Sequence, residues 1–331
     1  MHAAAFSSRG GVAHRAARLR GQSIIEYVLI IAVIGLVIVF AGPGVAGAIR
    51  NQFNLVGNTV NNGTSGGVEG GGASSGGSTG AASATVQAAV AKDAKDWTLD
   101  EQKGVAEDIA AKGEASPAYA KAKAAMDAGT KFSMKLADGQ TLEYRIIGIN
   151  HDDLAGGSGK AGLTFLTTST GIQSRMNATG TNAGGWEASE VRAKMNSGEI
   201  WNLMPSDFQS KVKSVSKLTN NVGGGSANKD TAVTATTDKL FLLSYSEIVP
   251  TPDSRWSDYS WIGKEGFQYE AFKGKVTDSF HGDAAIGDYW WERSMNPGIA
   301  LTFLFVNEYG YPMGNDITAT APYCVCPAWC F

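Results

Sequence analysis

Residues 132–149 read FSMKLADGQTLEYRIIGI, and this stretch decides the fold class. Apolar and polar residues alternate on both sides of Asp138-Gly139, a dipeptide typical of tight hairpin turns. Alternation with a period of two turns one face of each strand toward a core. The stretch therefore predicts an antiparallel hairpin at the start of a mixed α+β domain over residues 131–331.

The remainder of this domain combines short apolar runs with long polar segments. The runs predict strands at 162–167, 239–243, 300–306 and 323–331, helices at 187–196 and 206–212, and long loops at 219–237 and 250–282. Short strands, short helices and much irregular chain again indicate an α+β class.

Residues 83–130 are rich in Ala, Lys, Asp and Glu and predict short amphipathic helices. Thr98 and Glu101 have the spacing of a capping box, and Ser116-Pro117 predicts the start of another helix. We expect these helices to pack on the domain that follows.

The first 60 residues have a different character. Residues 1–21 contain arginines but no acidic residue, and an apolar run without a charge extends from Val28 to Ile49. Such a run is long enough to cross a hydrocarbon layer of ~30 Å as a helix. By the positive-inside rule, the arginines before this run should stay in the cytoplasm. The sequence therefore predicts a transmembrane helix within 22–60, with the rest of the chain outside the cell.

Residues 20–27, RGQSIIEY, resemble the class III leader of type IV prepilins, particularly the Flp/Tad group. The resemblance implies that a prepilin peptidase removes residues 1–21 by cutting after Gly21. Gln22 would become the new N-terminus, and Glu26 would pair with its amino group or with that of a neighbouring subunit. A buried ammonium and carboxylate offset each other's desolvation. A plain membrane anchor is the alternative.

Residues 61–82 are rich in Asn, Gly, Ser and Thr and predict a flexible linker. A subunit that only polymerises needs no such spacer, whereas a displayed domain does. The linker therefore favours a C-terminal domain held away from its anchor.

The C-terminal part resembles an uncharacterised domain that recurs in bacterial surface proteins. The resemblance rests on IGINHDD at 147–153, NAGGWE at 182–187, IWNLMP at 200–205, TDKLFLLS at 237–244, YWWERS at 289–294 and CPAWCF at 326–331. It implies a C-type-lectin-like fold, related in layout to the formylglycine-generating enzymes. Met295 stands where that domain usually has proline. The sugar-binding triplets of calcium-dependent lectins are absent from the sequence, so calcium-dependent sugar binding is not implied.

Composition argues against several function classes. The net charge of −3 does not indicate a nucleic-acid partner. Only His151 and His281 lie beyond the leader, and no catalytic set is recognisable, so we expect neither an enzyme nor a cofactor. His151-Asp152-Asp153 could bind a cation, but aspartate in a turn is commoner, so no metal site is predicted.

Two further motifs leave alternatives open. Residues 290–293, WWER, form either a ligand platform or a core strand with Glu292 or Arg293 paired beneath loops. Cys324, Cys326 and Cys330 are either buried small hydrophobes or contain one oxidised pair.

Residues 295–323 mix Tyr, Phe, Met and Asn, which is typical of adaptable binding surfaces. The predicted ligand-binding residues are Met295, Asn296, Asn307, Tyr309, Tyr311, Asn315, Asp316 and Tyr323. Phe303 and Phe305 share one strand face and are expected in the core. The layout also resembles the targets of diversity-generating retroelements, which vary such loops between fixed segments.

The sequence thus predicts a pilin-like surface protein that displays a C-terminal binding domain, as an adhesin or a variable recognition module. Its expected partners are the prepilin peptidase, other pilin subunits, the membrane, and an extracellular protein or glycan. It would move from the cytoplasmic membrane to the cell surface or a pilus. The alternatives are a structural pilin or pseudopilin and a surface enzyme.

Overall fold

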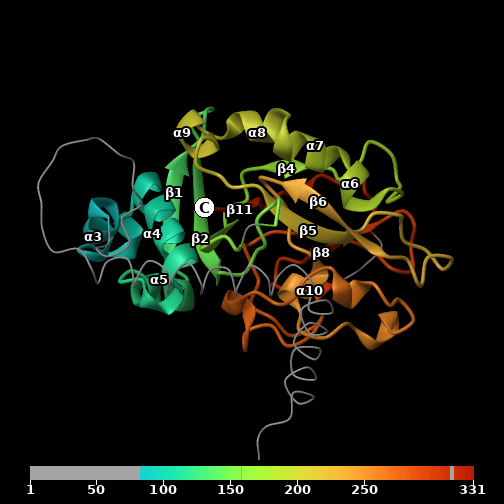
Figure 1. Ribbon diagram of the computed structural model, residues 1–331. Coiled ribbons are helices and arrows are strands. Elements are labelled where there is room, and N and C mark those ends of the chain that lie inside the picture. Colours follow the sequence, from blue (N-terminus) through green and yellow to red (C-terminus); the bar gives the residue numbers. More distant parts are fainter. Residues whose placement is uncertain (1–82, 158, 314–316) are drawn as a thin grey trace, which may run out of the picture. The chain divides into compact units, whose positions relative to one another are not determined.

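The computed structural model describes residues 83–331 except 158 and 314–316 (Figure 1). Its strands form three sheets, and the helices between them are short. The predicted mixture of α and β structure is present throughout this part of the chain.

Three helices precede the first strand. They are α3 (Ala84–Val90), α4 (Leu99–Lys112) and α5 (Tyr119–Asp127), with 3-10 turns η1 (Ala94–Asp96) and η2 (Gly113–Ala115) between them. The predicted capping box is confirmed, because Thr98 accepts from the Glu101 N–H and Glu101 accepts from the Thr98 N–H. Val105 and Ile109 are fully buried, so α4 packs on the domain as expected.

The first sheet contains the predicted hairpin. Its strand order is β1-β2-β3-β11, with β1 (Lys131–Lys135), β2 (Thr141–Ile149), β3 (Leu163–Thr167) and β11 (Ala328–Cys330), all antiparallel. Trp329 of β11 stacks on Phe165 of β3 with ring centroids 5.8 Å apart. The last strand of the chain therefore completes the sheet that the hairpin begins.

Gly162, directly before β3, fixes the distance between this sheet and α4. A Cβ there would lie 1.8 Å from the carbonyl oxygen of Ala106. Only glycine allows the helix backbone to approach the sheet so closely.

The second sheet lies deeper in the domain. Its order is β4-β10-β7-β8-β9, with β4 (Gln173–Ser174), β10 (Tyr323–Cys324), β7 (Trp290–Met295), β8 (Phe303–Val306) and β9 (Pro312–Met313). Every residue of β7 and β8 is buried, which explains why these strands do not alternate in hydrophobicity.

The third sheet is the pair β5 (Val215–Asn220) and β6 (Val233–Asp238). Helices α6 (Gly185–Ala188), α7 (Glu190–Asn196), α8 (Glu199–Leu203) and α9 (Ser206–Gln209) form a row along one side of the sheets (Figure 1). The opposite side carries α10 (Tyr245–Ile248) and the 3-10 turns η3 (Ser254–Trp256), η4 (Ile262–Lys264) and η5 (Glu270–Phe272).

Two of the predicted elements are wrong. The predicted loop 219–237 contains most of β6, and the predicted strand 239–243 is irregular apart from one bridge from Phe241 to Ala328. Its leucines are buried although the segment is not a strand, because β7 and β11 cover it. A run of buried apolar residues does not by itself distinguish a strand from a packed irregular segment.

The predicted fold class needs a correction. Among the described residues, no helix is both long enough and apolar enough to cross a membrane; the longest, α4, has 14 residues and is amphipathic, with charges along one side. The described residues therefore form a mixed α and β domain without a membrane-spanning helix, which replaces the fold class predicted above. Ranges 1–21, 22–60 and 61–82, with Gly21, Gln22 and Glu26, lie outside the described residues.

Candidate functional site

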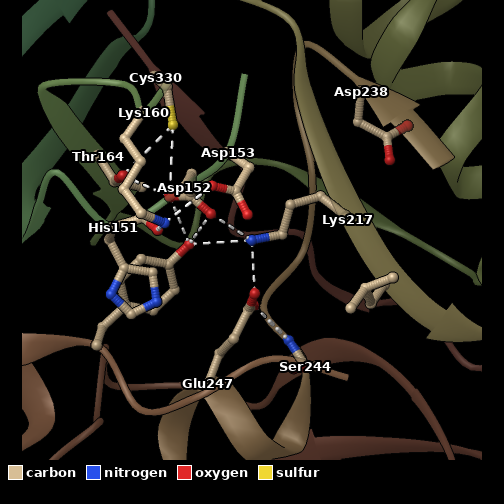
Figure 2. Close-up of polar contacts among 12 residues, drawn as sticks. His151, Asp152, Asp153, Lys160, Thr164, Lys217, Asp238, Ser244, Glu247 and Cys330 are labelled. Atoms are coloured by element: carbon tan, nitrogen blue, oxygen red, sulfur yellow. Dashed lines mark hydrogen bonds and ion pairs between the residues drawn. The ribbon is translucent and has the colours of Figure 1, made fainter. Parts of the chain in front are cut away.

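A network of charged side chains is buried inside the domain, and Figure 2 shows three of them, Asp152, Lys217 and Glu247. Asp152 follows β2, Lys217 lies on β5, Glu247 on α10 and Arg293 on β7. Lys217 Nζ is 2.6 Å from Asp152 Oδ1 and 2.5 Å from Glu247 Oε1. The side chains of this ionic network are at most 3 % exposed, so it connects the three sheets out of contact with water.

Backbone pairing places Asp152 opposite Lys217. The Ser216 N–H donates to the Asp153 carbonyl at 2.9 Å, and Leu154 forms a bridge with Val215. The chain leaving β2 thus runs beside β5 before it turns into β3. The position of the carboxylate is set by main-chain hydrogen bonds and not by the ion pair alone.

The Asp152 carboxylate is surrounded by donors. Thr164 Oγ1 donates to Oδ2 at 2.5 Å, and the Tyr269 hydroxyl lies 2.9 Å from each oxygen. Burial opposes ionisation of Asp152, but the Lys217 ammonium and the hydrogen bonds to the carboxylate together outweigh it and lower the pKa of the carboxyl below its usual range. The Phe241 ring covers the Lys217 ammonium, with Nζ 4.2 Å from the ring centroid.

Arg293 holds the second half of the network. Its Nη1 and Nη2 donate to Glu247 Oε2 and Oε1 at 2.5 and 3.0 Å, a bidentate pair. The same guanidinium also donates to the carbonyls of Leu242 and Glu265 at 2.8 and 2.7 Å. Burial raises the pKa of Glu247, but Arg293 and Lys217 outweigh it, and the net shift is downward.

Two more acids lie beside the network and behave differently. Burial raises the pKa of Glu265 to about 7, although Ser294 Oγ donates to its carboxylate and Asn220 N–H donates at 2.8 Å. Burial also raises the pKa of Glu292 well above its usual range, and neither of its carboxyl oxygens has a hydrogen-bond partner in the structure. With both Glu265 and Glu292 protonated, the charges of Lys217 and Arg293 balance those of Asp152 and Glu247.

The predicted ligand-binding residues divide between the interior and the surface. Met295 is fully buried on β7, and Asn296 is 5 % exposed, so neither side chain is available to a ligand here. Asn315 and Asp316 lie outside the described residues. Tyr309 is 68 % exposed.

The turn between β8 and β9 displays Tyr309 on a fixed backbone. The Asn307 Oδ1, itself buried, accepts from the N–H groups of Tyr309 and Tyr311 at 3.0 and 2.9 Å. Gly310 has φ of +87°, and a Cβ there would lie 2.6 Å from the Ala285 nitrogen. The turn is therefore held by hydrogen bonds within it and packs against the backbone at Ala285.

A second group of aromatic residues continues from this turn. Tyr323 is half-buried and stacks on Tyr289 with ring centroids 5.1 Å apart. A hydrogen bond to the Glu308 carboxylate raises the pKa of Tyr289 to about 12. Tyr289, Tyr309, Tyr311 and Tyr323, with Glu308, are called the tyrosine surface below.

A family model described as a domain of unknown function, DUF6273, matches residues 161–330. The chain belongs to this family. Comparisons with curated proteins and with solved structures found no match. The DUF6273 match contains Lys217, Glu247, Arg293 and the whole tyrosine surface, whereas Asp152 lies just ahead of it.

The structure of this DUF6273 chain also shows the surroundings of the WWER motif and of the three cysteines. Trp290 and Trp291 are both fully buried, so the core-strand interpretation of residues 290–293 is confirmed. No group of residues suited to a metal ion occurs in the part of the chain that the structure describes. Cys324, Cys326 and Cys330 are free and buried, as expected of small hydrophobic residues.

Sequence reasoning missed Lys217 and Glu247. Val215, Lys217 and Thr219 face inward on β5, while Leu218 is 42 % exposed. Strand alternation could have located the lysine, because Lys217 and Thr219 share the face opposite to Leu218. On this strand the polar pair faces inward and the apolar residue faces outward. Ser244 and Glu247 have capping-box spacing, and both halves of that box are present.

Proposed function

We propose that this protein is a surface-displayed recognition protein, whose C-terminal domain binds an extracellular partner through the tyrosine surface without catalysis. The observation that carries the proposal is the rigid turn at Asn307–Tyr311, which leaves Tyr309 68 % exposed. Rigid aromatic side chains provide contact area at a low cost in conformational entropy. Tyrosine hydroxyls beside Glu308 add hydrogen-bonding capacity, a combination that favours a protein partner.

The experiment is a protein array and a glycan array probed with residues 83–331. We expect specific protein partners, and Tyr309→Ala should weaken their binding at least tenfold, as for a central interface aromatic. Phe267→Ala is the matched control, because Phe267 is also an aromatic residue, 61 % exposed, on a different loop. Binding to glycans alone would change the ligand class, and binding to nothing would contradict the recognition proposal.

The display part of the proposal rests on the resemblance at residues 20–27. Cleavage after Gly21 by a prepilin peptidase would give a mature chain that begins with Gln22 and assembles with other pilin subunits. Mass spectrometry of the protein from its own cells tests this. Any other N-terminus removes the pilus-type display and leaves the recognition domain as a separate proposal.

The second candidate function is a structural pilin or pseudopilin. It predicts that this chain forms the bulk of sheared filaments, and that Tyr309→Ala leaves every phenotype unchanged. Uniform codons for residues 307–323 across sibling strains would count against diversification by a retroelement.

A further inference from the structure

The Lys217 amine and the Asp152 carboxyl are held in contact, and these are the two groups that condense to form an amide. The Nζ atom lies 2.6 Å from Oδ1, and the two side chains are 3 % and 2 % exposed. Both side chains are fixed by their surroundings, so the amine and the carboxyl stay together without competing water. Groups held in this way react as if at very high concentration.

We propose that Lys217 Nζ and Asp152 Cγ condense into an intramolecular isopeptide bond, with release of one water molecule. The bond that forms is Nζ–Cγ, and the bond that breaks is Cγ–Oδ1. Two protons leave Nζ and end on Oδ1, which departs as water. The ammonium and carboxylate together supply every atom, so no oxidant, reductant or co-reactant is needed.

Neighbouring groups match each step of this acyl transfer. Glu247 Oε1, 2.5 Å from Nζ, accepts the proton that the amine must lose before it attacks. Thr164 Oγ1 donates at 2.5 Å to Oδ2, where negative charge develops in the tetrahedral intermediate. The Tyr269 hydroxyl is 2.9 Å from Oδ1 and accepts from Lys217 Nζ at 3.1 Å, so it can pass a proton from the amine to the leaving oxygen.

Burial favours the amide over the ion pair. Two charges in a dry interior carry a large desolvation cost, whereas an amide is neutral. Arg293 keeps Glu247 in place through its bidentate contact, so the proton acceptor stays aligned with the lysine.

The bond would tie the chain that follows β2 to the middle of β5. It would close a covalent loop from residue 152 to residue 217, which contains β3, β4 and the helices α6 to α9. The first and third sheets could then not separate under a pulling force, whatever partner the domain binds.

The test is tryptic peptide mapping of the full chain by mass spectrometry. Trypsin releases residues 146–160 with Asp152, and does not cut after a lysine whose amine is an amide, so Lys217 stays within 214–229. We expect a linked species of these two peptides that is lighter by one water than their sum, with fragment ions that place the link at Asp152 and Lys217.

Two variants act as controls. Lys160→Met removes a nearby surface pair, Lys160 with Asp153, and also a tryptic site, so Asp152 then lies in peptide 146–175, which should still be linked to the Lys217 peptide. Lys217→Arg preserves a positive partner for Asp152 but cannot form a stable amide, so the linked species should vanish while the protein stays folded. Unlinked peptides from the wild-type protein, or a link from Lys217 to the peptide 240–255 with Glu247, would overturn the proposal.

Discussion

The ionic network and the tyrosine surface are built on neighbouring elements of the same protein but use polar groups in opposite ways. In the network, Arg293 reaches Glu247 and two carbonyl groups, and Lys217 reaches two carboxylates, all without water. Beneath the tyrosine surface, the buried Asn307 side chain binds the backbone of the turn, while Tyr309 remains exposed. The comparison shows that buried polar groups hold the backbone in place in both regions, while Tyr309 stays accessible at the surface.

The largest expected difference follows from Arg293→Met. The substitution leaves the Glu247 carboxylate buried without its bidentate partner, which should cost about 3–5 kcal/mol of unfolding free energy. Urea denaturation measures it. The control is Arg175→Met, since Arg175 also forms a bidentate pair, with Glu190, but at the surface. That change should cost less than about 1 kcal/mol, and equal losses would contradict the comparison.

A second difference should appear in the pH dependence of stability. The pKa of Glu292 is raised in the folded state, so above the ordinary glutamate range the unfolded chain releases a proton that the folded chain keeps. Stability from this group is complete at low pH and falls as pH rises toward the folded pKa. Glu292→Gln removes that fall and should stabilise the protein by about 1–3 kcal/mol at pH 8.

The matched measurements for Glu292→Gln are denaturation curves at pH 4 and pH 8. At pH 4 the titration of Glu292 should add little to the difference between the variant and the wild type, because the unfolded wild type still holds most of the proton that the folded state keeps. Glu143→Gln, at an exposed carboxylate, should show no such change. A Glu292→Gln gain that is the same at both pH values would exclude titration as its cause.

The internal bonds of the turn predict a smaller effect. Asn307→Ala leaves the N–H groups of Tyr309 and Tyr311 without their shared acceptor, which should cost about 1 kcal/mol. Hydrogen exchange of these two amides should rise in the variant. Unchanged exchange would show that the turn is held by something other than Asn307.

Tyr309→Ala should have the smallest effect on stability, within about 0.5 kcal/mol, because the side chain is mostly exposed. Its binding to a partner should nevertheless fall, as stated for the array experiment. Thermal unfolding and a binding titration on the same sample separate the two effects. A large loss of stability would place Tyr309 in the framework and not on the recognition surface.

Local pattern was sufficient for the elements with strong short-range signals. The hairpin around Asp138-Gly139 and the capping box at Thr98 both follow from residues close together in the sequence, whereas for residues 290–293 the sequence left two interpretations open. Pattern failed at 239–243, where packing by β7 and β11 buries an irregular segment. It also did not predict the burial of Met295, at the end of β7, and of Asn296, directly after it.

The sequence by itself determined the mixture of α and β structure in the described domain and the helix start at Thr98, because each depends on a few adjacent residues. Only the tertiary structure decided that Asp152, Lys217, Glu247 and Arg293 meet in one dry site. These residues are separated by up to 141 positions (293 − 152), and their encounter depends on how three sheets pack together. Side-chain periodicity reports which face of a strand is buried but not which distant charge lies opposite, and that is the physical reason for the difference.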